Sequence, residues 1–339
     1  MSFFQTAASN RNNALLISMG GLLFLALSIG LSIRLGAMSI SFSEILASFL
    51  SFEADNLNHQ LVQEIRIPRA CTAALAGAAF AVSGTVMQGL TRNPLADPSI
   101  IGINQGAGFA IALALAFLSA GSFWSMLGWS FAGSAVGAGL IVLLSSLSQH
   151  RLSPVTLTLA GAAISSLFSA LSTATALYFQ VAQDVSFWFA GGLSGAKWLH
   201  VFVLLPSLTI GFLLALSISR HLTVLAMGDD IATGLGQSAG RVRITALFSV
   251  MLLCGAAVAV SGTIGFVGLV VPHIVRAIVG VDYRYILPCS AIVGALLLVA
   301  ADIGARMINP PFETPVGAVT ALVGVPFFLY LARQKKRGL

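Results

Sequence analysis

The sequence predicts an all-α, polytopic membrane protein of about ten transmembrane helices, in which the whole chain, 1–339, forms a single transmembrane domain. Two observations carry this prediction. Of the 339 residues, 57% are apolar and only 8% are charged, and the mean hydropathy is +0.95, whereas a soluble domain carries roughly 25% charged residues. The apolar residues also fall in blocks of roughly twenty, the length at which a helix crosses the hydrocarbon core of a bilayer.

Ten apolar blocks are separated by charged residues or by Pro and Gly, and each block is expected to form one span. Their approximate limits are residues 14–33, 70–90, 99–119, 124–148, 154–179, 199–219, 242–263, 265–280, 286–305 and 315–332. The first block is longer than the apolar core of a signal peptide, which is about 7–15 residues, so we interpret it as a retained span. The eighth block is short and contains Pro272, which predicts a broken helix.

Two longer connections have a character of their own. Residues 34–65 form the first polar stretch, in which a small amphipathic helix is predicted from Ile45, Leu46, Phe49 and Leu50. Residues 180–198 are of mixed character, with Trp188 and Trp198 suited to a membrane interface.

Basic residues set the orientation of the spans. Ten spans put both termini on the same side of the membrane. If that side is the cytoplasm, 12 of the 17 Lys and Arg residues lie there and five lie on the other side. Cytoplasmic loops carry an excess of basic residues, so both termini are predicted to be cytoplasmic. The same bias accounts for the net charge of +6, and no nucleic acid is expected as a partner.

An internal repeat connects the second span with the seventh. Residues 78–86 and 256–264 are identical at seven of nine positions, and both contain Ser-Gly-Thr. Five crossings separate the two copies, so they must run in opposite directions. Inverted repeats of this kind are typical of transporters, with the substrate route at the repeat interface. The alternative is that small residues recur by chance in closely packed helices.

The motifs of common catalytic and metal sites are absent from the sequence. No GxxxxGK[ST] loop, HExxH pair or GxSxG elbow occurs, so no nucleotide site and no catalytic residue is predicted. The three cysteines, Cys71, Cys254 and Cys289, are scattered in apolar blocks, and no metal site is expected. The clearest ionisable residue inside a span is Asp302. A proton relay is one interpretation, and a local ion pair with Arg306, one helical turn further on, is the simpler one.

Four stretches occur in the order and spacing of a known family. They are Arg66–Arg69, Gln88–Pro98, Gly228–Gly236, and Gly265–His273 followed by Ala301–Arg306. Together they resemble the FecCD-type permease family of ABC importers, which takes up iron-siderophores, haem or cobalamin, and an iron-siderophore permease most of all. The resemblance covers nearly the whole chain from residue 14 onward.

The resemblance implies partners and a location. It implies a second permease subunit, identical or paralogous, and two ATPase subunits that bind ATP and Mg, so that this chain has no cofactor of its own and is not an enzyme. It also implies a substrate-binding protein that delivers a ferric siderophore, with haem or cobalamin as alternative cargo, in a bacterial cytoplasmic (inner) membrane. An ATPase-independent secondary transporter or channel is the alternative function, and a membrane enzyme is a third.

The resemblance also assigns roles outside the cytoplasm. Arg66, Arg69 and Arg306 lie at outer ends of spans, where they would receive acidic residues of the binding protein. Guanidinium groups bind carboxylates bidentately, and complementary charge sets the register of docking. The alternative is that they are interfacial anchors that face lipid head groups or water.

On the cytoplasmic side, the loop between the sixth and seventh spans resembles the helix that couples a permease to its ATPase. The expected coupling residues are Gly228, Asp229, Asp230, Ile231, Ala232, Leu235 and Gly236. Within them, Ile231, Ala232 and Leu235 can form an apolar face, the two carboxylates favour the helix start, and Gly234 and Gly236 favour its end. A solvated connector is the alternative.

The Asn93–Pro98 turn follows the second span on the same side. Its prolines fix an extended, non-helical backbone. By resemblance, Asn93 and Leu95 contribute to the cytoplasmic gate, and spans five and ten line the path. The alternative for Asn93–Pro98 is a plain rigid turn.

Overall fold

The computed structural model describes residues 2–36, 38–98, 102–118, 122–147, 154–190, 192–310 and 312–336. Within these ranges every regular element is a helix, which confirms the all-α prediction. In chain order they are α1 Ser2–Arg34, α2 Phe42–Leu50, α3 Leu57–Gln60, the π-helix η1 Leu61–Arg66, α4 Ile67–Thr91, α5 Ile103–Phe117, α6 Phe123–Leu147, α7 Pro154–Tyr178, α8 Ala182–Ala190, α9 Trp198–Ser217, α10 Ser219–Met227, α11 Asp229–Gly234, α12 Ala239–Ser261, α13 Val267–Val279, α14 Tyr283–Met307 and α15 Val316–Lys336.

Each predicted span coincides with a helix. The helices are, in order, α1, α4, α5, α6, α7, α9, α12, α13, α14 and α15. The predicted limits at 99, 119 and 148 lie outside the described residues. Six helical segments of the described chain are long and apolar enough to cross a membrane, by length and composition: Asn10–Arg34, Leu57–Thr91, Leu159–Tyr178, Trp198–Ser217, Ala239–Ser261 and Tyr283–Met307. The small amphipathic helix predicted within 34–65 is α2, which confirms that prediction.

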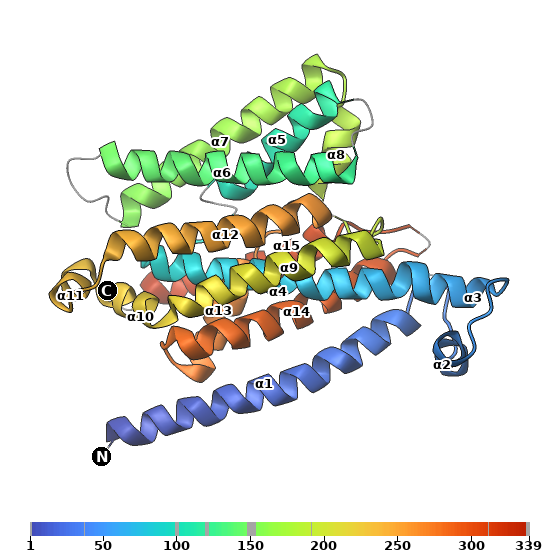
Figure 1. Cartoon of the computed structure of the whole chain (residues 1–339), viewed down its shortest axis with the longest axis horizontal. Coiled ribbons are helices and arrows are strands. Elements are labelled where there is room, and N and C mark those ends of the chain that lie inside the picture. Colours follow the sequence, from blue (N-terminus) through green and yellow to red (C-terminus); the bar gives the residue numbers. More distant parts are fainter. Residues whose placement is uncertain are drawn as a thin grey trace.

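The helices form an elongated bundle around α4 (Figure 1). Helices α9, α12, α13 and α14 pack on α4, while α5, α6 and α7 form a group that covers α12 on one side. Helix α1 lies along the opposite side against α14. Only 6% of the most apolar stretch of α1 is made of buried residues, compared with 89% in the segment Leu57–Thr91, which includes α4. The centre of the protein is therefore a helix that its own chain surrounds, and the periphery presents apolar side chains outward.

The bundle has two distinct ends. One carries α2 and α3, and we call it the α2 end; the other carries α10 and α11, and we call it the α11 end (Figure 1). Helix α1 starts, and α15 finishes, at the α11 end. Helices α4 and α12, in which the two copies of the repeated sequence begin, run in opposite directions, as predicted. The copies differ locally, because Ser83 and Gly84 lie inside α4 whereas α12 stops at Ser261 and Gly262 has a φ of 68°.

Glycines allow α4 to approach its neighbours closely. A Cβ atom at Gly84 would lie 2.0 Å from the carbonyl oxygen of Gly268 in α13, and one at Gly77 would lie 2.3 Å from that of Gly294 in α14. Lipid chains are as apolar as the side chains between helices, so association in a membrane depends on close packing of small residues rather than on escape from water. The Ala- and Gly-rich sequence of α4 supplies this packing.

Helix α13 is continuous through Pro272, so the predicted break inside the eighth span is wrong. The interruption comes earlier, where α12 has ended and Phe266 has a φ of 69°. Pro272 has no N–H to donate to the carbonyl of Gly268. The side-chain amide of Gln88, on α4, donates to that carbonyl at 3.2 Å instead. A side chain from a neighbouring helix thus satisfies the carbonyl that the proline leaves free.

We predict that Gly84→Ala destabilises the protein. The added methyl group would overlap backbone atoms of Gly268, which cannot rotate away, and overpacking of this kind costs roughly 1–3 kcal/mol. Thermal unfolding of the purified chain measures the effect. Gly139→Ala is the matched control, because a Cβ at Gly139 of α6 meets nothing within 4 Å. Equal stability of the two variants would contradict the proposed packing of α4.

Candidate functional site

At the α2 end, the three arginines predicted to dock a binding protein form one buried cluster. Arg69 Nε lies 2.9 Å from Asp302 Oδ1, and Arg306 Nη2 lies 3.1 Å from Asp302 Oδ2. Arg69 Nη1 also lies 2.6 Å from Glu313 Oε1. Asp302 is fully buried, while the side chain of Glu313 is 42% exposed. The cluster therefore combines one buried carboxylate with a second one at the surface.

The other donors of the cluster serve the end of α1. Arg66 Nη1 donates to the carbonyls of Ile33 at 2.7 Å and Arg34 at 2.9 Å. Arg306 Nη1 donates to the carbonyl of Ser32 at 3.1 Å, and its Nη2 donates to the Ser32 hydroxyl at 2.7 Å. The last carbonyls of a helix have no partner within the helix. Here two guanidinium groups from α14 and η1 supply the missing donors.

The prediction that Asp302 is a local ion-pair partner of Arg306 is confirmed, since the two charges meet across one helical turn. Sequence reasoning missed its second partner, Arg69, and missed Glu313 altogether. Arg66, Arg69 and Arg306 are only 6%, 5% and 8% exposed. They do not face lipid head groups or water, so the interpretation as interfacial anchors does not fit. Their docking role stays a prediction.

At the α11 end, the predicted coupling segment is a short helix. Gly228 separates α10 from α11 with a φ of 139°, and Gly236 follows α11 with a φ of 74°. The predicted apolar face divides in two: Ala232 is fully buried, whereas Ile231 is 49% exposed and Leu235 is 70% exposed. The segment thus presents an outward pair of apolar side chains, and its coupling role stays a prediction.

Two arginines hold α11 in place through Asp229. Arg243 of α12 lies 2.8 Å from Asp229, and Arg92, which follows α4, lies 3.3 Å from it. The sequence assigned Asp229 and Asp230 to the helix start. In the structure Asp229 is buried and links three elements, while Asp230 is exposed. No pattern in the sequence predicts the pairing with Arg92, which is 137 positions away.

The turn after α4 is closed by hydrogen bonds and lies beside this ion pair. Arg92 ends α4 in the left-handed region, with a φ of 52°. The side chain of Asn93 accepts from the N–H of Leu95 at 3.0 Å, and its carbonyl accepts from the N–H of Ala96 at 3.0 Å. Asn93 and Leu95 are both half-buried. Their role as a gate stays a prediction. The backbone is non-helical, as the two prolines predict, but residues 93–96 form a hydrogen-bonded turn instead of the extended segment that was expected.

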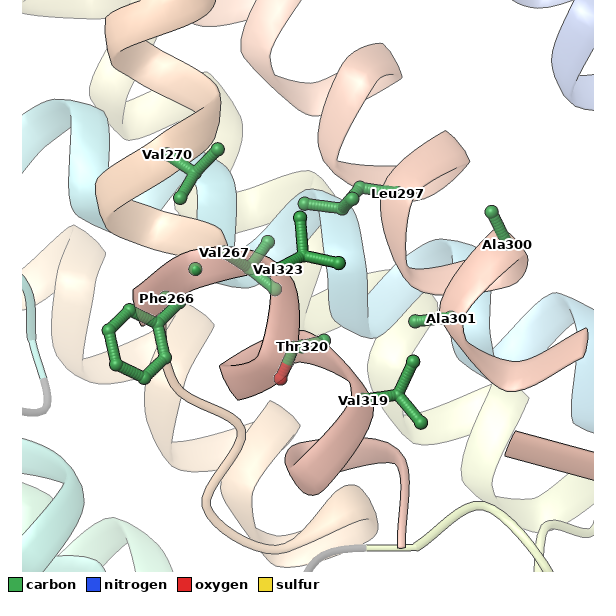
Figure 2. A pocket seen from close by; sticks show the side chains of 10 residues that line it. Phe266, Val267, Val270, Leu297, Ala300, Ala301, Val319, Thr320 and Val323 are labelled. Carbon is green, nitrogen blue, oxygen red and sulfur yellow. The ribbon is translucent and has the colours of Figure 1, made fainter. Parts of the chain in front are cut away.

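An apolar cavity of about 190 Å³ separates parts of α13, α14 and α15 (Figure 2). Val267 and Val270 come from α13, Leu297 from α14, and Val319 and Val323 from α15. The hydroxyl of Thr320 is the one polar side-chain group that lines it, so it offers nothing to bind a charged ligand. Among the described residues no group of three or more His, Cys, Asp or Glu side chains could hold a metal ion. The cavity leaves space beside α15.

The family model described as the FecCD transport family matches residues 23–334. The chain belongs to this family. The FecCD permease is 49% identical, over 98% of its own length and 86% of the other, to the iron(3+)-hydroxamate import system permease protein FhuB of Bacillus subtilis. It is 45% identical to the iron-uptake system permease protein FeuB of the same organism, over 92% and 93% of the two chains.

A solved structure of a metal-chelate type ABC transporter in an inward-facing conformation has the same fold as this FecCD permease. The two share 30% sequence identity with a TM-score of 0.82, over 94% of this chain and 99% of the other. The family that four motifs predicted is therefore confirmed. The chain is a membrane protein and a permease, which is a transport subunit and not itself an enzyme.

We predict that Asp302→Asn strongly destabilises the FecCD permease. The change leaves Arg69 and Arg306 buried without their shared carboxylate, and breaking a buried pair in this way costs about 3–5 kcal/mol. Unfolding of the purified chain by heat or denaturant measures the loss. Asp282→Asn is the matched control, because Asp282 pairs with the more exposed Arg284, and an exposed pair contributes at most about 1 kcal/mol. Similar losses in the two variants would contradict the central place of Asp302.

Proposed function

We propose that the chain is the transmembrane permease subunit of an ATP-binding-cassette importer for a ferric siderophore, with haem or cobalamin as less favoured cargo. The observation that carries this proposal is the 49% identity to an iron(3+)-hydroxamate import permease along nearly the whole chain. In this proposal the cargo is delivered by a separate binding protein, and separate ATPase subunits bind ATP and Mg. The permease itself holds no cofactor and performs no bond chemistry.

The proposed topology has ten spans and two cytoplasmic termini in a bacterial cytoplasmic membrane. The α11 end then faces the cytoplasm and the α2 end faces outward. Two points support this orientation: α1 starts and α15 finishes at the α11 end, and the topology predicted from the sequence assigns 12 of the 17 basic residues to the cytoplasmic side. A second permease subunit, identical or paralogous, completes the path, with α7 and α15 lining it. Large apolar side chains exposed along α7, among them Leu159, Leu167 and Leu171, are available for contact with the second permease subunit.

The coupling segment suggests how work from the ATPase reaches the bundle. The exposed Ile231 and Leu235 are one helical turn apart and can seat in a groove of a partner. Displacement of α11 acts on Asp229, whose two arginines connect it to α12 and to the end of α4. Arg92 directly precedes Asn93, so the same displacement reaches the turn proposed as the gate. Closure of the ATPase would then shift the gate turn between its open and closed states through α11 and Asp229.

Burial imposes a condition on docking at Arg66, Arg69 and Arg306. Each guanidinium already has acceptors within the chain, so a carboxylate of the binding protein must replace one of them. Glu313 is the exchangeable partner, because it is partly exposed and reaches Arg69 through one contact of 2.6 Å. We propose that docking substitutes a carboxylate of the binding protein for Glu313 on Arg69.

The geometry around Asp302 does not support the ATPase-independent alternative. It needs a titrating group in the membrane, and Asp302 was the candidate. Both of its oxygens already lie against guanidinium groups, at 2.9 and 3.1 Å, so the geometry fits a structural ion pair.

The proposed function is tested by transport in vesicles that contain the complete complex. Vesicles with the permease, its ATPase and an external binding protein loaded with ferric hydroxamate are expected to accumulate iron only with internal ATP. Uptake against a gradient by vesicles that hold the permease alone, without nucleotide, would refute the proposal. A complex that is stimulated by loaded haem or cobalamin binding protein instead would retain the class and change the cargo.

We predict that Leu235→Asp abolishes coupling without unfolding the permease. The side chain is exposed, so the chain should fold, but a charge in an apolar groove of the ATPase should cost association roughly tenfold or more. Co-purification of the ATPase subunit and stimulated ATP hydrolysis are the measurements. Ser238→Asp, which adds the same charge to an exposed residue just beyond the segment, should retain both. A Leu235→Asp complex that assembles and hydrolyses ATP normally would remove the coupling assignment.

We predict that Glu313→Gln tightens docking of the binding protein. Loss of the competing carboxylate frees Arg69 Nη1 while Asp302 still holds the rest of the guanidinium group. A partly exposed pair worth up to about 1 kcal/mol corresponds to a two- to fivefold change in affinity. Titration of ATPase stimulation with binding protein measures this change. Glu64→Gln removes an exposed charge at the same end of the bundle and should leave the affinity unchanged. Weaker or unchanged docking of the Glu313→Gln permease would contradict the exchange.

A further inference from the structure

A second cavity, of about 310 Å³, lies at the α11 end and differs from the apolar one beside α15. Its polar side is formed by Gln88 and Arg92 at the end of α4, Thr223 of α10, Arg276 of α13 and Tyr283 of α14. Its apolar side includes Met227 and Val281, which are 60% and 66% exposed. Since about 10–15 Å³ is enough for one water molecule, this cavity has room for a larger polar group. Of its lining residues, Arg92 and Pro94 also belong to the proposed coupling path, and the others have no role in it.

Arg276 contributes a positive charge to this cavity and has neutral neighbours. Its Nη2 donates to Oε1 of Gln88 at 3.1 Å, and the Tyr283 phenol is its other polar contact. Gln88 cannot turn away, because its amide nitrogen is held by the carbonyls of Gly268 and Leu269. Within the part of the chain that the structure describes, no carboxylate forms an ion pair with Arg276. The charge is thus oriented by fixed dipoles, and none of the described carboxylates serves as its counter-ion.

The second arginine of the cavity is only partly neutralised. Arg92 lies 3.3 Å from Asp229, but the same carboxylate is closer to Arg243, at 2.8 Å. One carboxylate therefore serves two guanidinium groups. Asp282, next to Tyr283 in the chain, is engaged by Arg284 at 2.6 Å. The balance of charge around the cavity is positive.

We propose that this cavity binds a phosphate group, which a phospholipid head group or a soluble phosphate can supply. Two guanidinium groups and a phenol present N–H and O–H donors, the groups that bind phosphate oxygens with charge-assisted hydrogen bonds. Basic pockets between membrane helices on the cytoplasmic side are suited to anionic lipid head groups. The exposed apolar rim of Met227 and Val281 favours the lipid as the source, because a soluble phosphate has no apolar part to place there.

Lipid retention by the purified full-length chain tests the proposal. Native mass spectrometry should show more phosphatidylglycerol than phosphatidylcholine retained by the wild type. Arg276→Gln should weaken retention of phosphatidylglycerol roughly tenfold, as expected from the loss of a charge-assisted hydrogen bond. Arg284→Gln is the matched control, because it removes the same charge from the same end of the bundle outside the cavity, and it should retain the lipid.

A second arm distinguishes the source of the phosphate. The melting temperature is measured in phosphatidylcholine nanodiscs with inorganic phosphate, and sodium chloride at equal ionic strength is the reference. If the site accepts soluble phosphate, phosphate should raise the melting temperature of the wild type and leave that of Arg276→Gln unchanged. If Arg276→Gln fails to fold, Arg92→Gln provides the same comparison from an exposed position. The proposal is overturned if lipid retention is equal in the cavity variants and in Arg284→Gln and inorganic phosphate does not stabilise the wild type.

Discussion

Close backbone contact along α4 is the constraint on which the arrangement of the bundle depends. At Gly84 and Gly77 the helix touches the backbones of α13 and α14 with no space for a methyl group. In lipid this dense packing replaces the hydrophobic effect as the source of helix association. The same helix carries Arg69 at one end and Gln88 at the other, so both candidate sites are held in register by one buried rod. Displacement of α4 against α13 or α14 would alter both ends together.

The two ends of the bundle treat charge in different ways. At the α2 end, the buried Asp302 is matched by Arg69 and Arg306, and the remaining donors reach backbone carbonyls. Buried ion pairs contribute little net stability, because desolvation offsets the attraction, and their removal one partner at a time is costly. Such a cluster therefore fixes geometry more than it adds stability. At the α11 end, Asp229 is shared by two arginines, and Arg276 faces a cavity with neutral partners. That end retains positive charge that a ligand or a partner subunit can use.

Local patterns predicted much of this structure, and contacts distant in sequence did not follow from them. Blocks of about twenty apolar residues placed the spans on helices, and the spacing of Ile45, Leu46, Phe49 and Leu50 located α2. The ion pair of Asp302 with Arg306 was predictable because both lie on one helix face. Arg69 and Asp302 are 233 positions apart, and nothing in their own neighbourhoods selects one for the other. The helix break predicted at Pro272 was wrong for the same reason, because the amide that replaces its missing hydrogen bond comes from Gln88 of another helix.

The capping of α1 has a consequence for the synthesis and membrane insertion of the protein. Its last carbonyls are satisfied by side chains from residues 66 and 306, and the second of these is synthesised almost at the end of the chain. A nascent α1 leaves the ribosome long before that donor exists, and exposed carbonyls are poorly tolerated in hydrocarbon. Until then, water or lipid head groups must donate hydrogen bonds to these carbonyls. The hydrogen bonds between α1 and Arg306 can therefore form only after α14 has been synthesised and inserted.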